Sequence, residues 1–394
     1  MKPELLAPAG DLEKVKIALL YGADAVYIGG TMFSLRARAS KFTIDKIKEA
    51  TDFAHSLGKK IYITTNIVPR NDDLMYLDDY LKSLDQIGVD AIICSSPVII
   101  ERAQLLTDLE IHLSTQLSVA SSLLASYWQK RGITRVVLAR ECSLDEIEQI
   151  KKNTLTELEV FIHGGMCVSY SGRCTLSNYM TDRDANRGGC AHSCRWKYDL
   201  YEKEQLVSED FDFQMSSKDL ESLAFIPRLC EIGVSSLKIE GRMKSIHYIA
   251  TVVNTYRRLI DDYFNHEMLP IEVYENEIKK AENRLTSYGF MKGTTTTEQQ
   301  LYNMRSEVPT KEFVGIVLSY DEVNQEAWIE QRNYFTIGDK LERFSPVDQN
   351  EIFEVVSMEN EEGLTLDVAR HPLQKIKIKV SIKLEPYDLL RKVF

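Results

Sequence analysis

The sequence predicts an α/β protein: a (β/α)8 barrel of the TIM type with a cysteine-rich insertion after the seventh strand, followed by a small C-terminal all-β barrel domain. Three observations lead to this prediction. Eight short apolar runs alternate with amphipathic stretches between residue 4 and about residue 264 of the 394. The interval between the seventh and eighth runs lengthens from about 23 residues to almost 80. Beyond about residue 305, polar and apolar residues alternate, as in half-buried antiparallel strands.

Each of the eight runs is expected to form a strand. Strands of a parallel sheet that helices cover on both faces read as nearly continuous apolar sequence. The expected strands are residues 4–10, 25–30, 60–66, 91–96, 111–116, 135–141, 158–165 and 236–242. An open doubly wound sheet is the alternative, and eight strands in about 250 residues favour the closed barrel.

The stretches between the runs carry helix-start signals. Asp11 and Thr43 stand at the expected N-caps of the first two helices. Ser143 followed three residues later by Glu146 forms a capping-box pattern before the seventh strand. The alternation of strands and helices therefore continues through the whole of the predicted barrel.

The domain organisation follows from these patterns. Residues 1–270 are expected to form the barrel domain, with the cysteine-rich insertion at residues 165–215. Residues 271–305 are expected to form a helical arm or linker, and residues 306–394 an accessory β-barrel. Long loops on rigid scaffolds are usually functional, which directs attention to the insertion.

Composition restricts the function. A net charge of -11 and a pI near 5.3 argue against a protein that coats nucleic acid by bulk electrostatics. Composition does not exclude a local basic patch. Residues 34–41 and 241–245 are candidates for it, and the alternative is that they form ordinary solvated surface. Signal-peptide and membrane-spanning patterns are lacking, so we expect a cytoplasmic protein with no membrane partner. In that reducing compartment, clustered cysteines more often bind metal or do redox work than form disulfides.

The insertion holds four cysteines with the spacing C-x6-C-x15-C-x3-C. They are Cys167, Cys174, Cys190 and Cys194. Four thiolates complete one tetrahedral zinc site or one four-iron cluster. The lack of paired C-x2-C knuckles and the glycine-rich surroundings favour iron and sulfur over zinc, with redox thiols or coincidence as the other readings. Cys94, Cys142 and Cys230 lie in or beside apolar segments and are expected to pack in the core.

Unusual polar residues stand where the predicted strands end, and in a (β/α)8 barrel that is the active-site face. They are Asn66, Ser114, Gln116, Arg140, Glu141, His163, Glu240 and Arg242. Each could instead be a structural hydrogen-bonding residue at the barrel mouth.

The stretch EVFIHGGMCVSYSGRCTLS, residues 159–177, is similar to the signature of peptidase family U32, the collagenase-like peptidases. The runs PELLAPAG, IHLSTQLS, NRGGCAHSCRW and SLKIEGRMKSIHY resemble the tRNA-hydroxylating branch of that family, and VGIVLSYD and ARHPLQ resemble the accessory domain of that branch. The resemblance spans nearly the whole chain. It departs at Gly165, where the family has serine or alanine.

The resemblance implies an enzyme with a 4Fe-4S cluster that hydroxylates carbon five of the wobble uridine of tRNA without molecular oxygen, with prephenate as the hydroxyl donor. The family's cluster cysteines correspond to Cys167, Cys174, Cys190 and Cys194. The implied partners are the anticodon loop of tRNA and the small dicarboxylate, and a homo- or hetero-oligomer stays open.

Roles for the remaining candidates follow from their chemistry. His163, Glu141 and Glu240 are the expected proton-transfer residues, with His163 favoured because its ordinary pKa of about 6.5 lies near working pH. Cations would bind a dicarboxylate, and hydrogen bonds and stacking would hold a uracil ring. The substrate-binding candidates are Arg36, Asn66, Gln116, Arg140, Tyr170, Lys238 and Arg242, with Tyr27 and Trp196 as further stacking candidates.

Two other functions stay open at this stage. One is a peptidase, although the sequence has neither HExxH nor GxSxG. The other is a non-catalytic RNA-binding module whose metal centre only braces the insertion.

Overall fold

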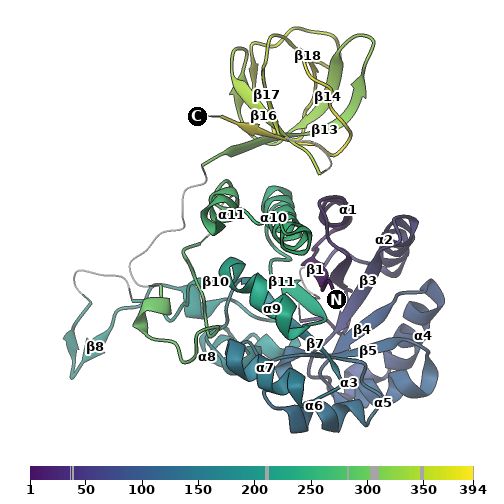
Figure 1. The fold of residues 1–394 in the computed structure, drawn as a ribbon, viewed down its shortest axis with the longest axis vertical. Coiled ribbons are helices and arrows are strands. Elements are labelled where there is room, and N and C mark those ends of the chain that lie inside the picture. Colours follow the sequence, from purple (N-terminus) through teal and green to yellow (C-terminus); the bar gives the residue numbers. More distant parts are fainter. Residues whose placement is uncertain are drawn as a thin grey trace.

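The computed structural model describes residues 1–35, 37, 40–208, 213–281, 284–301, 310–346 and 350–393, and its first part is a closed barrel of parallel strands (Figure 1). The barrel strands are β1 (Glu4–Pro8), β2 (Ala25–Gly29), β3 (Lys60–Thr65), β4 (Ala91–Cys94), β5 (Glu110–Leu113), β6 (Arg135–Val137), β7 (Glu157–Gly164) and β11 (Ser236–Ile239). Each strand pairs with the next, and β11 pairs with both β7 and β1, which closes the ring. The predicted barrel is confirmed, and an open doubly wound sheet is excluded.

Helices cover the outside of the barrel. They are α1 (Leu12–Leu20), α2 (Ile44–Ser56), α3 (Asn71–Leu74), α4 (Leu77–Ile87), α5 (Pro97–Leu106), α6 (Ser122–Gln129), α7 (Leu144–Lys152), α9 (Ile226–Ile232) and α10 (Ile246–Asn265). The predicted caps are present: Asp11 and Thr43 each accept a hydrogen bond from a backbone N–H, and Ser143 and Glu146 form the capping box. Within the described residues, no helix combines the length and the apolar character needed to cross a bilayer.

Several strands end earlier than their apolar runs suggest. Strand β5 ends at Leu113 rather than residue 116, and β6 ends at Val137 rather than residue 141. The polar residues that follow therefore lie beyond the carboxyl ends of the strands, with Gln116 in the short 3-10 helix η2 (Thr115–Leu117). A residue beyond the end of a strand can point its side chain at a ligand. A residue within a strand that is buried on both faces cannot.

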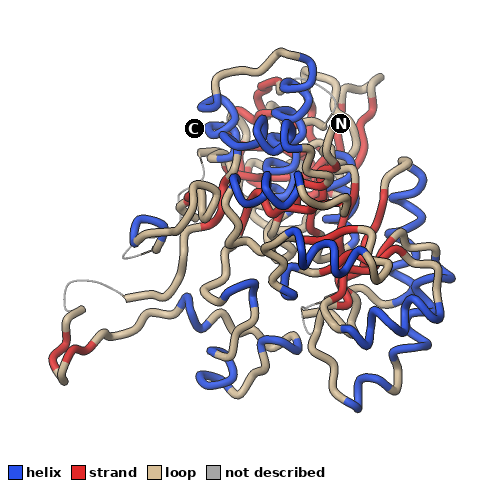
Figure 2. The backbone as a smooth tube through the Cα atoms, turned by 60° about the horizontal axis from the view of Figure 1, so that its bottom comes forward, coloured by secondary structure: helices blue, strands red, loops and turns tan. Residues whose placement is uncertain are grey.

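The insertion after β7 is a compact, irregular segment. It contains η3 (Tyr170–Gly172), α8 (Leu176–Thr181), η4 (Ala185–Arg187), η5 (Ser193–Arg195) and the hairpin of β8 (Tyr201–Glu202) and β9 (Gln205–Leu206). Figures 1 and 2 show this hairpin standing away from the barrel. The chain returns through β10 (Asp219–Glu221), which pairs antiparallel with the end of β7.

The segment before the C-terminal domain lies on the barrel. Helix α11 (Ile271–Ile278) packs against α10, and β12 (Thr286–Ser287) pairs with β10. Leu301 donates a backbone hydrogen bond to Ser216 of the insertion at 2.8 Å. The domain boundary predicted near residue 305 lies outside the described residues.

The C-terminal domain is all-β, as predicted, and Figure 1 shows its main sheet rolled up beyond α1, α10 and α11. The main sheet has the order β17 (Glu351–Glu354), β16 (Lys340–Phe344), β21 (Leu389–Lys392), β13 (Glu312–Asp321), β14 (Glu326–Gln331), β20 (Lys375–Lys379) and β18 (Met358–Asn360), and β15 (Phe335–Thr336) pairs separately with β19 (Val368–Ala369). Within the described residues, the strand pairings of this domain are antiparallel, and the domain has its own apolar core.

A buried arginine joins the two domains. Arg391 of β21 has no solvent-exposed surface and lies 2.8 Å from Glu277 of α11. Its Nε donates to Nε2 of His247 at 2.9 Å, and its Nη2 donates to Thr251 at 2.7 Å. The seam between the domains is therefore a polar network on α10 and α11.

Candidate active site

A cavity of about 620 Å³ opens at the carboxyl ends of the barrel strands. Residues that follow β3, β5, β6 and β11 form one side of it, and the insertion forms the other. The sequence-predicted residues that line it are Tyr27, Asn66, Ser114, Gln116, Arg140, Cys167, Cys174, Cys190, Cys194, Lys238, Glu240 and Arg242. Most of the candidates are thus brought together at the predicted end of the barrel, and their roles stay predictions.

All four cysteines of the insertion face this cavity. The Sγ atoms of Cys167 and Cys174 each accept a hydrogen bond from a backbone N–H two residues further along the chain, at 3.5 and 3.3 Å. Burial raises the pKa of the Cys167 thiol, and charge on Cys174 and Cys190 acts in the same direction. The four thiols are therefore near enough to influence one another electrostatically. As they stand in the described part of the chain, no group of three or more His, Cys, Asp or Glu side chains is arranged to hold a metal ion.

Arg140, from the loop after β6, connects the barrel to the insertion. Its Nη1 donates to the carbonyl oxygen of Gly165 at 2.6 Å, and its Nη2 lies 3.0 Å from Oε2 of Glu240. The guanidinium also stacks over the ring of Phe161, 3.8 Å from the ring centroid. These contacts fix the plane of the guanidinium, which is what bidentate recognition of an anion requires.

Arg242 approaches the cavity from the loop after β11. Its Nη1 donates to the hydroxyls of Ser34 and Thr64, each at 3.2 Å. Gly29 makes this approach possible, because a Cβ there would lie 2.5 Å from Nη1 of Arg242. Arg36, which was predicted to bind the substrate with these arginines, lies outside the described residues.

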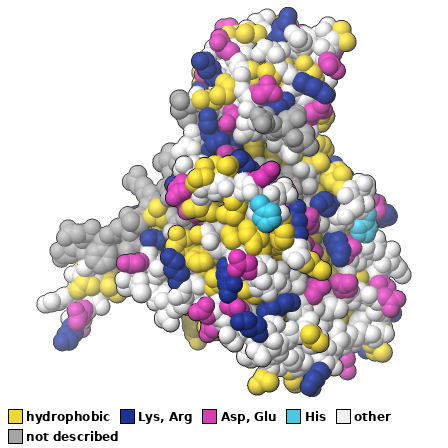
Figure 3. All heavy atoms as spheres, in the orientation of Figure 1, with side chains coloured by type: hydrophobic (Ala, Val, Ile, Leu, Met, Phe, Trp, Pro, Cys, Tyr) yellow, Lys and Arg dark blue, Asp and Glu magenta, His cyan; other side chains and the backbone are white. Residues whose placement is uncertain are grey.

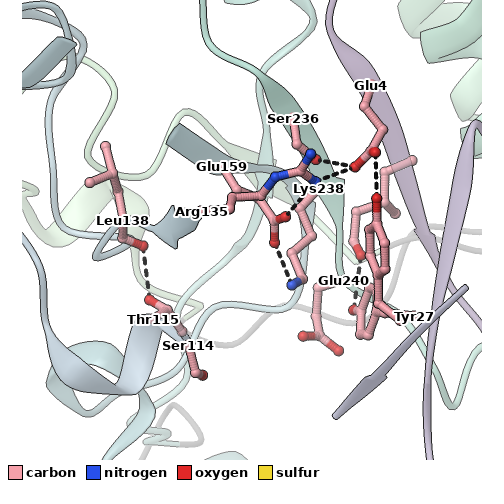
Figure 4. Close-up of polar contacts among 12 residues, drawn as sticks. Glu4, Tyr27, Ser114, Thr115, Arg135, Leu138, Glu159, Ser236, Lys238 and Glu240 are labelled. Atoms are coloured by element: carbon pink, nitrogen blue, oxygen red, sulfur yellow. Dashed lines mark hydrogen bonds and ion pairs between the residues drawn. The ribbon is translucent and has the colours of Figure 1, made fainter. Parts of the chain in front are cut away.

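A chain of buried charges runs from the cavity into the barrel interior (Figure 4). Nζ of Lys238 lies 2.6 Å from Oε1 of Glu159 and 4.6 Å from the centroid of the Tyr27 ring. Nη1 of Arg135 lies 3.6 Å from the other oxygen of Glu159 and 2.6 Å from Oε1 of Glu4. Burial lowers the pKa of Lys238 while the charge of Glu159 opposes that shift. The network holds the Lys238 side chain in place beneath the cavity.

Positive charge dominates the cavity wall, although the chain as a whole is acidic. Among the described residues that line the cavity, two are acidic, Asp219 and Glu240. The cationic ones are Arg140, Arg195, Lys238, Arg242, Lys244 and Arg284. On the face drawn in Figure 3, by contrast, side chains of both signs are interspersed. A concave surface with one sign of charge concentrates ligands of the opposite sign.

The proton-transfer role predicted for His163 does not agree with its position. It is 1% exposed and is not among the described residues that line the cavity. A β-bulge in the pairing of β7 with β11 leaves Ile162 unpaired, and the imidazole packs on α10 instead, with Nδ1 3.2 Å from the hydroxyl of Tyr256. Burial lowers the pKa of His163 to about 3, so the ring is neutral at working pH. The prediction assumed an ordinary pKa and a side chain directed into the cavity, and the structure shows neither.

Glu141 likewise has a structural role. Its Oε1 accepts the backbone N–H of Ser171 at 2.8 Å, and Oε2 lies 3.4 Å from the hydroxyl of Ser171. Ser171 has a φ of 52°, a strained conformation that this contact supports, in the loop between Cys167 and Cys174. Glu141 therefore anchors the cysteine loop, and its predicted proton-transfer role is not supported.

Two predicted stacking residues lie outside the cavity wall. Tyr170 is 57% exposed and Trp196 is 42% exposed, and neither is among the described residues that line the cavity. Tyr27 does line it, but its hydroxyl donates to the carbonyl oxygen of Ile239 at 3.0 Å and its ring is buried.

Sequence reasoning missed Asp219. This residue of β10 is 3% exposed, lines the cavity and lies 3.6 Å from Nη1 of Arg284. Burial raises the pKa of its carboxyl group, although Lys244 and Arg195 act in the opposite direction. A short antiparallel strand within an irregular insertion gives no periodic signal, so the sequence offered no means of placing Asp219 here.

Gln116 and Asn66 supply the neutral polar groups of the cavity. Oε1 of Gln116 accepts from the Ser114 hydroxyl at 3.3 Å, while its Nε2 has no hydrogen-bond partner among the described residues. Oδ1 of Asn66 accepts the backbone N–H of Leu35 at 3.2 Å. An unpaired amide nitrogen in a buried position has a cost of about 1–3 kcal/mol, which a ligand acceptor can offset.

Comparison with known proteins gives a consistent result. A model of peptidase family U32 matches residues 10–301, and a model of the family's C-terminal domain matches residues 309–391. The chain is 48% identical to the tRNA hydroxylation protein P1 of Bacillus subtilis (strain 168), over 99% of this chain and 95% of that protein. It is 34% identical to the tRNA hydroxylation protein P of Escherichia coli (strain K12), over 93% of this chain and 91% of that protein. It is also 36% identical to the 23S rRNA 5-hydroxycytidine C2501 synthase of Escherichia coli (strain K12), over 75% of this chain and 43% of that one.

Proposed function

The chain belongs to peptidase family U32, and we propose that it is an RNA-modifying enzyme of that family rather than a peptidase. Its reaction would be the oxygen-independent hydroxylation of carbon five of the wobble uridine in tRNA, with a 4Fe-4S cluster as cofactor and prephenate as hydroxyl donor. Relatives that align over more than nine-tenths of their length are named tRNA hydroxylation proteins, which supports tRNA as the substrate.

One observation carries the proposal: four thiols and six cationic side chains share a single cavity. Cations suit an RNA segment and a dicarboxylate, both of which are anionic. The peptidase alternative lacks such support. His163, four residues before Cys167, is hydrogen-bonded to the hydroxyl of Tyr256.

The donor set fits an iron–sulfur cluster. Four thiols that face one cavity, with backbone N–H groups directed at two of the sulfurs, are the usual surroundings of cluster ligands. When bound, such a cluster supplies electron transfer and an iron able to polarise an oxygen-bearing group.

The chain's own residues would bind the reactants and move the proton. Arg140 and Arg242, which line the cavity, would hold the two carboxylates of the donor. The amide nitrogen of Gln116 would donate to a carbonyl oxygen of the uracil ring. Asp219, whose pKa is raised by burial, takes over the proton-transfer role first given to His163. A wobble base in a single-stranded anticodon loop can leave the stack to reach the cavity at little cost.

The decisive experiment combines a deletion strain with complementation. Mass spectrometry of tRNA nucleosides should show 5-hydroxyuridine derivatives with the wild-type gene and their loss with Cys167→Ser. Cys230→Ala, which alters a buried cysteine away from the cavity, is the matched control and should restore modification.

Protein purified without oxygen provides the second readout. Wild type and Cys230→Ala should contain about four irons per chain, and Cys167→Ser markedly less. Unchanged 5-hydroxyuridine derivatives in the deletion strain, with redundant pathways removed, would refute the tRNA assignment. Peptide hydrolysis that persists after iron removal would establish the peptidase instead.

A further inference from the structure

The outer surface of the insertion exposes large apolar and aromatic side chains, of which Val168 also lines the cavity. Tyr179 is 84% exposed, Tyr170 57%, Val168 46%, Met180 44% and Trp196 42%. Monomeric proteins rarely leave several such residues exposed in one short segment unless the surface contacts a partner. We name this set, Val168, Tyr170, Tyr179, Met180 and Trp196, the insertion rim.

Each residue of the insertion rim lines the cavity or stands within three residues in the chain of one that does. Helix α8, which carries Tyr179 and Met180, also presents Leu176 and Ser177 to the cavity. The hydroxyl of Ser177 accepts the backbone N–H of Ala191 at 3.1 Å, which ties α8 to the segment that leads into η5 and Trp196. A ligand that extends out of the cavity on this side therefore meets the rim next.

The charge of the same segment indicates what kind of partner this is. Between residues 165 and 198 there are five arginines and lysines against two aspartates, in a chain whose net charge is -11. Arg173, Arg183 and Lys197 are exposed. Arg187 is held by Asp73 and Arg195 lines the cavity, so these two serve the insertion's own structure and site. Exposed aromatic rings interleaved with exposed cations are the arrangement with which proteins bind single-stranded nucleic acid.

We propose that the insertion rim is a stacking platform for unpaired bases of an RNA loop, with Tyr179 and Trp196 as the main stacking residues and Arg173, Arg183 and Lys197 contacting the phosphates. The proposal rests on the proposed function in one respect: the loop is that of the tRNA whose wobble base enters the cavity. A base stacked on an aromatic ring gains affinity without sequence readout, so the rim would serve several tRNAs with different neighbouring bases.

The test measures binding of a fluorescent RNA hairpin that reproduces an anticodon stem and loop to the full-length, cluster-loaded protein. A hairpin with the same stem closed by a tight four-base loop is the control RNA. Tyr179→Ala and Trp196→Ala should each weaken binding of the anticodon hairpin about tenfold and leave the control hairpin within about twofold. Tyr179→Phe, which keeps the ring, should bind like wild type.

Tyr127→Ala is the matched control variant. Tyr127 is an exposed tyrosine of α6, 46% exposed, outside the insertion, and its loss should not change RNA binding. Arg183→Ala should weaken binding of both hairpins and lower the slope of log affinity against log salt by about one. Iron content and melting temperature show whether each variant is folded.

The outcomes separate this inference from the proposed function. Wild-type affinity in both folded alanine variants, or a wild-type protein that does not bind the anticodon hairpin, would overturn the platform even if tRNA is hydroxylated. A dimer that Tyr179→Ala dissociates would reassign the rim to protein contact and also overturn it. Rim-dependent binding by a protein that leaves tRNA unmodified would instead remove the proposed function and keep the platform.

Discussion

At the scale of single residues, the sequence showed which side chains have chemistry suited to the site. It did not show in which direction each side chain points. The sequence placed His163 at the end of a strand, which the structure confirms. A single unpaired residue, Ile162, shifts the alternation of β7, so the imidazole packs on α10. A β-bulge depends on the partner strand, and one sequence read by itself does not contain that information.

The burial of His163 predicts how stability depends on pH. The folded protein holds this ring neutral with a pKa of about 3, whereas the unfolded chain has an ordinary pKa near 6.5. Between these values the unfolded state binds a proton that the folded state does not, so the free energy of unfolding falls as the pH is lowered. From pH 7 to pH 5 this residue should cost about 2 kcal/mol.

His163→Asn tests this contribution, because asparagine can still bond the Tyr256 hydroxyl but does not titrate. Urea unfolding at pH 7 and pH 5 should show a smaller loss of stability for the variant than for wild type. Equal losses in the two proteins would mean that His163 is protonated in the folded state.

At the scale of elements, the insertion depends on anchors that the barrel supplies. Glu141 holds the backbone of Ser171, Arg140 holds the carbonyl of Gly165, and Asp73 holds Arg187. The cysteine spacing could be read from the sequence, but these anchors join positions up to 114 residues apart. The sequence could not show which residues form these contacts, because that depends on where the strands lie in space.

Removal of one anchor should loosen the cysteine loop. Glu141→Ala deletes the acceptor of the Ser171 N–H, a charge-assisted hydrogen bond, with an expected cost of about 1–3 kcal/mol within the insertion. We expect less iron per chain and faster proteolysis between Cys167 and Cys174. Glu101→Ala, on an exposed position of α5, is the control. If the iron content of Glu141→Ala equals that of wild type, the carboxylate is not an anchor.

At the scale of the whole molecule, the order of the elements was predictable and their docking was not. Eight apolar runs sufficed for the barrel, because strands covered by helices leave a periodic signal in the sequence. The docking of the C-terminal domain depends on Arg391, whose partners Glu277, His247 and Thr251 stand on two helices far away in the chain. No local pattern marks an arginine that will lose all contact with solvent.

Arg391→Met should destabilise the protein by about 1–3 kcal/mol, since it removes the buried hydrogen bonds to Glu277, His247 and Thr251, while Glu277 keeps its ion pair with Lys280 at 2.6 Å. Urea unfolding followed by tryptophan fluorescence measures this loss. Lys375→Met, which removes an exposed cation of the same domain, should change the stability by less than about 0.5 kcal/mol. A similar result for both substitutions would show that the buried pair does not hold the domains together.

Closure of the barrel also sets an order of assembly. Strand β1 pairs with β11. Leu5 can therefore pair with Leu237 only after the ribosome has added more than 200 further residues. Until then the growing chain presents an unsatisfied strand edge to its surroundings, and such edges invite aggregation. The slow step in making this enzyme should therefore be the late arrival of the eighth strand, and a chaperone that shields the first strands would increase the yield.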